Sequence, residues 1–286
     1  MSKNFRDTYE ELLLGLLNRG HLETNARTGA AIRVAGPRSF TLDLGDGRLP
    51  VCGIRKTYPK TAAAEVAWFL QGRKEVDFIK RYAPIWDKFV EDDGRTVAGA
   101  YGYRWRNHFG RDQVSDAIAA LDANPSDRRV FISAWDPGED GLGRPSKNVP
   151  CPVGFTLSIT ADRLNSTLLI RSSDVFVGLP YDVMGHALLM QAIMSSLNIS
   201  RVGRGDAPLR LGEMQVSLAH PHLYEVHREM ADCALSASPS DETIIMPDWG
   251  VKRITGFPDA YVSTVAILAD NVRVLPEYSC RPEVVA

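Results

Sequence analysis

The sequence lacks most of the features that mark specialised classes of protein. Its four cysteines are widely spaced in 286 residues and include no CxxC pair, so neither a zinc site nor a disulfide framework is indicated. No apolar run approaches the roughly 20 residues of a membrane span, and the opening "MSKNFRDTYEELLLGLLNRG" has an amphipathic charged pattern unlike a signal peptide. A net charge of -2 excludes a general attraction to nucleic acid or anionic membranes. We therefore expect a cytoplasmic globular protein that binds any anion through local arginines.

The length and composition suit an ordinary folded core. With 286 residues, 44% hydrophobic and 24% charged, the chain can form one large domain or two small ones. No linker is long enough to divide it, so we predict a single domain over residues 1–286. The segments richest in proline, glycine and charge are expected to be loops, namely "EDDGRTVAG", "DPGEDGLGRPSKN" and "SPSDETIIMPDWG".

Hydrophobic periodicity predicts a mixture of helices and strands. The expected helices are Tyr9 to Leu17, Ala62 to Leu70, Val114 to Leu121 and Val183 to Leu197. The expected strands are Val130 to Ala134, Phe155 to Thr160 and Thr167 to Ile170. Because their order is not a regular alternation of strand and helix, the predicted fold class is α+β.

An acid, Asp182, stands at the start of the apolar run "GLPYDVMGHALLMQAI". Aspartate is a favoured helix N-cap, because its carboxylate accepts from free backbone N–H groups and suits the positive end of the helix. This stretch alone leaves open whether Asp182 is a cap or serves another purpose.

Cys151 lies in "NVPCPVGFTLSI", between two prolines and directly before an expected strand. The prolines fix the local backbone and donate no N–H, so this setting can present a side chain at the entrance to the strand. Free thiols are also often inert core residues. The pattern therefore permits either a nucleophile or a buried thiol.

Other polar residues near expected strand ends have similar alternatives. Arg171 and Asp174, in "LLIRSSDVFVGLP", can lower a thiol pKa or grip a phosphate, or form a surface ion pair. Arg128 and Arg129, in "NPSDRRVFISAW", can hold an anion or lie in a solvated turn. The stretch "HPHLYEVH" lacks the spacing of a metal-binding helix, and we expect no metal. A cysteine, histidine and aspartate set also permits a thiol hydrolase.

Several blocks occur in a fixed order along the chain: "AEVAWFLQGRKEVDFIKRYAPIWDKF", "AGAYGYRWRNHFG", "DRRVFISAW", "VPCPVGF", "RSSDVFVGLPYDV" and "HPHLYEVH". Their order and spacing resemble thymidylate synthases and their nucleotide-hydroxymethylating relatives. The resemblance runs from "ETNARTGAAIRV" to the last residues. It implies a single α+β domain whose mixed sheets pack back to back across a homodimer.

The resemblance implies roles for individual residues. Cys151 matches the nucleophile that attacks C6 of the pyrimidine, Glu65 the carboxylate that organises a water relay, and Tyr101 the hydroxyl near the C5 proton. The implied nucleotide ligands are Arg27, Arg171 and Ser172 on the phosphate, Arg128 and Arg129 lent by the other subunit, and His222 with Tyr224 at the sugar 3′-hydroxyl. The implied folate site comprises Arg55, Lys56, Trp86, Asp174, Gly178 and the tail "RPEVVA", which ends at Ala286. The implied co-substrate is 5,10-methylenetetrahydrofolate.

These residue types suit the chemistry. A pyrimidine C5 is a poor nucleophile until a thiolate adds at C6, after which it can attack the one-carbon unit. Removal of the C5 proton and expulsion of tetrahydrofolate need a positioned base and relay, which suits Tyr101 and Glu65. A dianionic monophosphate needs several guanidinium forks, and a dimer can supply some of them in trans.

Two positions depart from the synthase pattern. Pro152 stands where the synthases usually carry histidine, so one member of the usual water network is missing. Asp182 stands where they carry the asparagine that reads uracil, and the family's cytidylate-specific members make this same change. Cytosine inverts the uracil pattern with an amino donor and an N3 acceptor, and a carboxyl that holds or shares a proton can satisfy both. Asp182 is therefore predicted to read cytosine, with the N-cap as the competing account.

The sequence thus predicts a folate-dependent enzyme that modifies C5 of dCMP. Trp86 and the tail favour a dry pocket, and hence reductive methylation to 5-methyl-dCMP. Hydroxymethylation of dCMP or CMP is the alternative, because Pro152 alters the water network in a direction that the sequence does not give. A catalytically silent nucleotide-binding relative is a remoter alternative.

Overall fold

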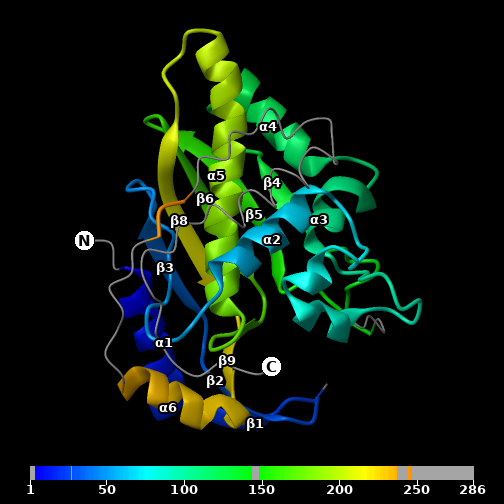
Figure 1. The fold of residues 1–286 in the computed structure, drawn as a ribbon, viewed down its shortest axis with the longest axis vertical. Coiled ribbons are helices and arrows are strands. Elements are labelled where there is room, and N and C mark those ends of the chain that lie inside the picture. The colour runs from blue at the N-terminus through cyan, green and yellow to red at the C-terminus, as the bar shows by residue number, and fades with distance from the viewer. Residues whose placement is uncertain (1–3, 27, 144–147, 237–243, 247–286) are drawn as a thin grey trace.

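The computed structural model describes residues 4–26, 28–143, 148–236 and 244–246, and these residues build two sheets (Figure 1). Both sheets are mixed, because β7 and β9 run parallel, as do β6 and β8, whereas the other pairs run antiparallel. The smaller sheet has the order β1 (His21–Thr24), β2 (Ala31–Val34), β9 (Pro221–Tyr224), β7 (Ser173–Asp174). The larger has the order β3 (Arg38–Asp43), β8 (Arg210–Leu218), β6 (Arg163–Ile170), β5 (Pro152–Thr160), β4 (Phe131–Ser133).

The helices begin at residues that suit a helix start. Asn4 accepts a hydrogen bond from the Asp7 amide at 2.9 Å, and Asp112 accepts one from the Ser115 amide at 3.0 Å, which caps α1 and α4. The helices are α1 (Phe5–Arg19), α2 (Pro59–Leu70), α3 (Tyr101–Tyr103) with a π-helical turn at Arg104–His108, α4 (Gln113–Ala123), α5 (Leu179–Gly203) and α6 (Arg228–Ser236), with 3-10 turns at Ile79–Arg81, Pro84–Phe89 and Glu225–His227. In the described ranges, no helix combines the length and apolar content needed to cross a bilayer.

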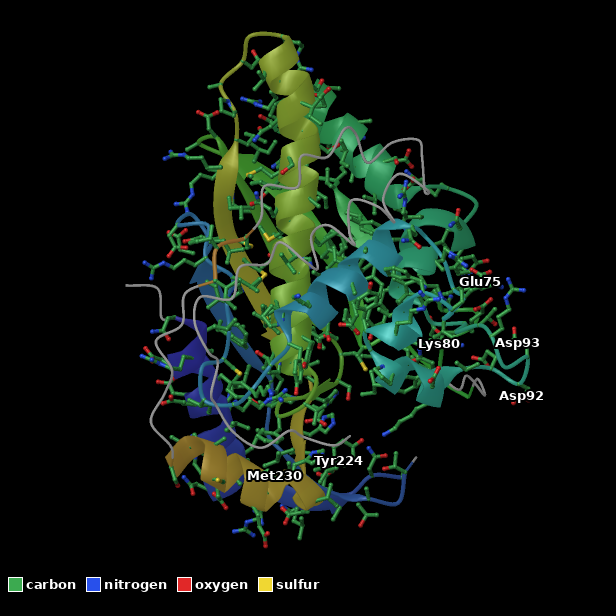
Figure 2. The ribbon with its side chains drawn as sticks, viewed as in Figure 1. Glu75, Lys80, Asp92, Asp93, Tyr224 and Met230 are labelled. Atoms are coloured by element: carbon green, nitrogen blue, oxygen red, sulfur yellow. The ribbon has the colours of Figure 1, made fainter. Side chains whose placement is uncertain are left out.

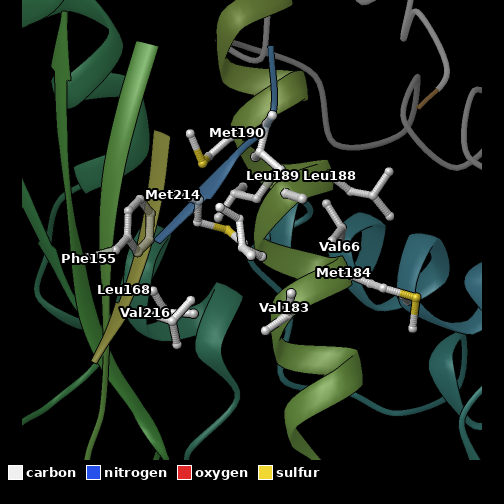
Figure 3. Packing of buried hydrophobic residues seen from close by; sticks show 14 of the residues in the cluster. Val66, Phe155, Leu168, Val183, Met184, Leu188, Leu189, Met190, Met214 and Val216 are labelled. Carbon is white, nitrogen blue, oxygen red and sulfur yellow. The ribbon is translucent and has the colours of Figure 1, made fainter. Parts of the chain in front are cut away.

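The main core lies around α5, which is covered by the larger sheet on one side and by α2 on the other (Figures 1 and 3). A helix enclosed in this way is apolar around most of its surface. Figure 3 shows Val183, Leu189 and Met190 of α5 on the side of Phe155, Leu168, Met214 and Val216 of the strands, with Met184 and Leu188 on the side of Val66. Truncating one of these side chains to alanine would cost roughly 2–5 kcal/mol.

A second hydrophobic cluster is formed by side chains of α2, including Trp68, and of residues 75–100, including Trp86. Glu75, Lys80, Asp92 and Asp93 mark this segment in Figure 2. Tyr101 packs against both this cluster and the main core. The start of α3 is therefore held at the boundary between the two clusters.

The predicted helices and strands are confirmed, with ends that differ by a few residues. In the described part of the predicted loops, the structure contains isolated bridges, at Thr96 and Ile245, but no helix or strand. The mixed helix and strand content agrees with the predicted fold class. The elements that were not predicted are β1, β2, β3, β7, β8, β9, α3, α6, the π-helical turn and the 3-10 turns.

Candidate active site

Cys151 lies directly before β5, where the antiparallel pairing with β6 brings Arg171 beside it. The Arg171 amide donates to the Cys151 carbonyl at 2.9 Å. The Arg171 guanidinium donates to the carbonyls of Pro150 and Val149, each at 2.8 Å, and reaches Cys151 Sγ at 3.9 Å. A guanidinium at this position stabilises negative charge on the sulfur. The structure therefore supplies a half-buried thiol with a neighbouring cation.

Tyr101 is the first residue of α3, and its ring lies 5.7 Å from the Trp86 ring and 5.2 Å from the Phe69 ring. Burial raises the pKa of the Tyr101 hydroxyl well above its usual value, and negative charge on Cys151, Asp182 and Glu65 raises it further. A hydrogen bond with the Cys151 backbone acts in the opposite direction on the same pKa. Tyr101 therefore stays protonated and lies within electrostatic range of Cys151 and of both carboxyl groups.

Glu65 is placed by α2, with its side chain toward Trp86. Its Oε1 accepts from the Trp86 indole N–H at 2.7 Å. Burial raises the pKa of Glu65 to about 7, and the hydrogen bond from Trp86 lowers it by a smaller amount. A carboxyl group with this pKa can both take and release a proton near neutral pH.

Asp182 lies inside the first turn of α5 and does not cap it. The N-cap is Gly178, and the Asp182 amide already donates to the Gly178 carbonyl at 3.1 Å. The competing N-cap account is therefore wrong, because the helix begins at Leu179, ahead of the carboxylate. Burial, followed by the charges of Glu65 and Asp174, raises the pKa of Asp182 to about 8. The side chain is thus a neutral acid at neutral pH.

The turn from Asp174 to Gly178 leads into α5 and is held by its own backbone. Asp174 Oδ1 accepts from the amides of Phe176 and Val177 at 3.0 and 3.1 Å, and the Gly178 amide donates to the Asp174 carbonyl at 2.9 Å. These bonds fix the direction in which the Asp174 carboxylate points.

The adjacent residues Arg55 and Lys56 differ in the burial and the contacts of their side chains. Arg55 is buried; its guanidinium donates to the Tyr9 hydroxyl at 3.3 Å and to the Val177 carbonyl at 3.0 Å. The half-buried Lys56 places its ammonium 5.3 Å from the centre of the Tyr58 ring. Arg55 thus ties α1 to the turn before α5, so that Lys56 is the more accessible cation of the pair.

A family model described as "Thymidylate synthase" matches residues 7–258 of the chain. The chain belongs to the thymidylate synthase family. The family performs folate-dependent C5 methyl transfer on a nucleotide, with 5,10-methylenetetrahydrofolate as co-substrate. This assignment confirms the resemblance at the level of the family and confirms the expected co-substrate.

The residues that the family resemblance assigns to the nucleotide phosphate lie in different places. Arg171 and Ser172 are half-buried, and the Arg171 guanidinium lies beside Cys151 Sγ. Arg128 and Arg129 are exposed before β4, where the Arg129 guanidinium donates to both carboxylate oxygens of Asp127, at 3.1 and 2.9 Å. Within the described residues, Arg129 is thus ion-paired with Asp127 of its own chain. The remaining predicted residues, Arg27 and Ala286, fall outside the described part of the chain.

The residues assigned to the sugar lie on β9, which pairs with β7 so that His222 is opposite Asp174. His222 is buried, and its Nδ1 lies 3.2 Å from the His220 carbonyl. The rings of His222 and Tyr224 are 5.4 Å apart, and Figure 2 labels Tyr224 near α6. The pairing of β7 with β9 therefore brings the predicted sugar residues close to the turn before α5.

Trp135 and Tyr9 are site neighbours that the sequence analysis did not single out. The Arg171 guanidinium carbon lies 5.9 Å from the centre of the Trp135 ring, and the Tyr9 hydroxyl donates to the Phe176 carbonyl at 2.9 Å. Trp135 ends the block "DRRVFISAW", so its place in a family block was a usable signal. Tyr9 lies in an ordinary amphipathic helix and carries no such signal.

A cluster of His108, Asp136 and Glu139 brings three side-chain ligand atoms within 4.8 Å of one another. The buried Arg104 guanidinium lies among them, 2.9 Å from Glu139 and 3.3 Å from Asp140. The positive charge of Arg104 explains why these acids gather, so we describe the cluster as an ion-pair network.

Proposed function

We propose that this protein transfers a one-carbon unit to C5 of dCMP through a covalent bond between Cys151 and C6 of the base. The feature that supports cytosine is the Asp182 carboxyl, which stands where the synthases carry asparagine and whose pKa is raised to about 8 by burial and by the charges of Glu65 and Asp174. One carboxyl oxygen can accept from the N4 amino group while the acid proton is donated to, or shared with, N3. The synthase asparagine, in contrast, always presents an amino donor to uracil O4.

The other residues of the site support a covalent mechanism. Arg171 stabilises the Cys151 thiolate that attacks C6. Tyr101, which stays protonated, places its hydroxyl near the nucleophile and both acids, and Glu65 can exchange a proton near pH 7. Trp86 fixes the direction of the Glu65 carboxylate. Bound methylenetetrahydrofolate would supply the one-carbon unit.

The residues around this acid cluster suit the folate. Trp86 offers a buried aromatic face, Asp174 a carboxylate with a fixed direction, and Lys56 an accessible cation for a carboxylate of the co-substrate. Gly178 has no side chain to obstruct the turn before α5. Arg55 is expected to act indirectly, by holding this turn, because its guanidinium is already bonded to Tyr9 and Val177.

We further propose that the product is 5-methyl-dCMP. The transferred carbon would then receive a hydride from the tetrahydrofolate, which would leave as dihydrofolate, and this requires that water is excluded. The buried Trp86 ring, with Phe69 and Tyr101 around it, supports a dry site. Mass spectrometry of the nucleotide and the absorbance of dihydrofolate distinguish the two products. Formation of a hydroxymethyl nucleotide without dihydrofolate would show that the reaction is hydroxymethylation. The assignment of cytosine as the base would be unaffected.

We also propose a homodimer of single-domain chains, in which Arg128 and Arg129 reach the phosphate of the partner's nucleotide. The exposed position of these arginines before β4, and the exposed Phe131 side chain at 47%, support a contact at this edge of the larger sheet.

The rate of C5-tritium release from dCMP and dUMP tests the base assignment. Comparable release from both nucleotides would contradict it, and no release despite normal dCMP binding would favour a silent nucleotide-binding protein.

A further inference from the structure

A cavity of about 440 Å³ opens on the outer face of the larger sheet. Its lining includes Leu169 and Ser217. Side chains alternate along a strand, so these two point away from Leu168 and Val216, which pack on the side of α5. The cavity therefore lies on the face opposite α5.

The charged residues that line this cavity are two arginines, Arg38 and Arg171. The Arg38 guanidinium donates to the carbonyls of Gly36 and Pro37 at 3.3 and 3.0 Å. The bonds recorded for Arg171 likewise go to carbonyls and to Cys151 Sγ. Carbonyl groups carry no net charge, so neither positive charge is neutralised by these contacts.

Other arginines of the described chain make a clear contrast. Arg104, Arg163 and Arg204 each form an ion pair with an aspartate. Arg38 and Arg171 thus share one cavity without a carboxylate among its lining residues. A cavity with two positive charges and no lining acid is suited to an anion.

The strand register places the backbones of the two arginines near each other. Arg38 is opposite Leu218, and Leu218 is opposite Ile170, which precedes Arg171. Two strand spacings, roughly 10 Å, therefore separate Arg38 from Ile170. Because Leu218 and Ile170 pack in the core, the Arg38 side chain leaves the edge strand β3 on that side, and it must turn around the edge of the sheet to share a phosphate with Arg171.

We propose that Arg38 is a further ligand of the nucleotide phosphate and forms a two-arginine anion site with Arg171. The identity of the nucleotide rests on the proposed function, whereas the site itself requires only a phosphate monoester. Ser39 and Ser217, which are cross-strand partners that line the cavity, offer hydroxyl donors to the same anion.

The test compares Arg38→Ala, Arg38→Lys and Arg210→Ala. Arg210 is the control, since it is an exposed arginine at the other end of β8. Calorimetry measures the dissociation constants of dCMP and dUMP, and inorganic phosphate is used as a competitor. Loss of a charged hydrogen bond should raise both nucleotide dissociation constants roughly tenfold or more in Arg38→Ala and weaken competition by phosphate. Arg38→Lys should recover part of the affinity and Arg210→Ala should match the unmutated protein.

Several outcomes separate this inference from the proposed function. Unchanged dCMP affinity in Arg38→Ala would overturn the inference and leave the function standing. Phosphate binding that depends on Arg38, in a protein that turns over no nucleotide, would support the site and overturn the function. If Arg38→Ala weakened self-association in sedimentation equilibrium, and high protein concentration restored full dCMP affinity, Arg38 would be a contact between copies and the inference would be wrong.

Discussion

The two sides of Cys151 differ in how their ionisable groups are held. On one side, burial raises the pKa values of Glu65, Asp182 and Tyr101, and the negative charge of Glu65 further raises those of Asp182 and Tyr101. On the other side, the Arg171 guanidinium is held by neutral carbonyls and keeps its charge. The acid side can therefore hold and exchange protons near neutral pH, whereas the arginine side presents a fixed charge. A base is recognised through its hydrogen-bond donors and acceptors, and a phosphate through its charge. The acid side therefore suits the base of a nucleotide, and the arginine side suits its phosphate.

Removal of the nucleophile should have the largest effect on this comparison. Cys151→Ser is expected to lower C5-tritium release by roughly 10³-fold or more, because the covalent route through C6 is lost. Cys233→Ala, which removes an exposed thiol on α6, is the matched control. If Cys151→Ser kept its tritium release, Cys151 would not be the nucleophile.

Exchange of the base-reading residue tests the acid side alone. Asp182→Asn should lower kcat/KM for dCMP by roughly ten- to a hundredfold and raise it for dUMP, because the amide presents a fixed donor to O4. Asp122→Asn, whose carboxylate pairs with Arg204 near the other end of α5, should leave the ratio of the two substrates unchanged. An Asp182→Asn enzyme with the original preference would contradict the assignment of cytosine.

The arginine side can be tested by mixing subunits. Arg129→Ala and Cys151→Ala homodimers should each be nearly inactive, whereas random exchange of subunits should restore about a quarter of the sites, each with both groups intact. The measurement is tritium release after exchange verified by mass spectrometry. No recovery in verified mixed dimers would mean that Arg129 acts within its own chain or not at all.

The hydrogen bond from Trp86 to Glu65 has a smaller effect, on pH dependence. It lowers the pKa of Glu65, so Trp86→Phe should move the limb of the pH–rate profile that reports Glu65 upward from about pH 7. Trp105→Phe is the control, because the buried Trp105 indole N–H has no hydrogen-bond partner among the described residues. Equal shifts in the two variants would indicate a packing effect instead of a lost hydrogen bond.

Sequence predicted the parts of this molecule that depend on local pattern. The buried helix around Val183 and the strand that contains Phe155 have strong periodicity, whereas His21–Thr24 is exposed at every position and gave no hydrophobic signal. Asp182 could be singled out because it replaces one residue in a family block. Its raised pKa could not be predicted, because it depends on burial and on Glu65 from a different helix.

Arg55 shows the same limit for a single side chain. The family resemblance assigns it to the folate, but the structure buries it against Tyr9 and Phe176. That position depends on how α1 packs on the turn before α5, which no local pattern in the sequence describes. Sequence alone could equally not predict that Lys56 is half-buried while its neighbour Arg55 is buried.

The pH dependence of stability tests whether Asp182 is a neutral acid in the fold. The pKa of Asp182 rises from 3.8 to about 8, so between these values the unfolded chain releases a proton that the folded chain keeps. The free energy of unfolding should therefore fall as pH rises through this window and level off above it. Asp182→Asn cannot ionise, so its stability relative to the unmutated protein should grow as pH rises from about 4 to 8, by up to about 6 kcal/mol for a shift of this size. Urea denaturation at about pH 5, 7 and 9 measures this difference. A difference that does not change with pH would mean that Asp182 is ionised at neutral pH, and that its proton is not available to cytosine N3.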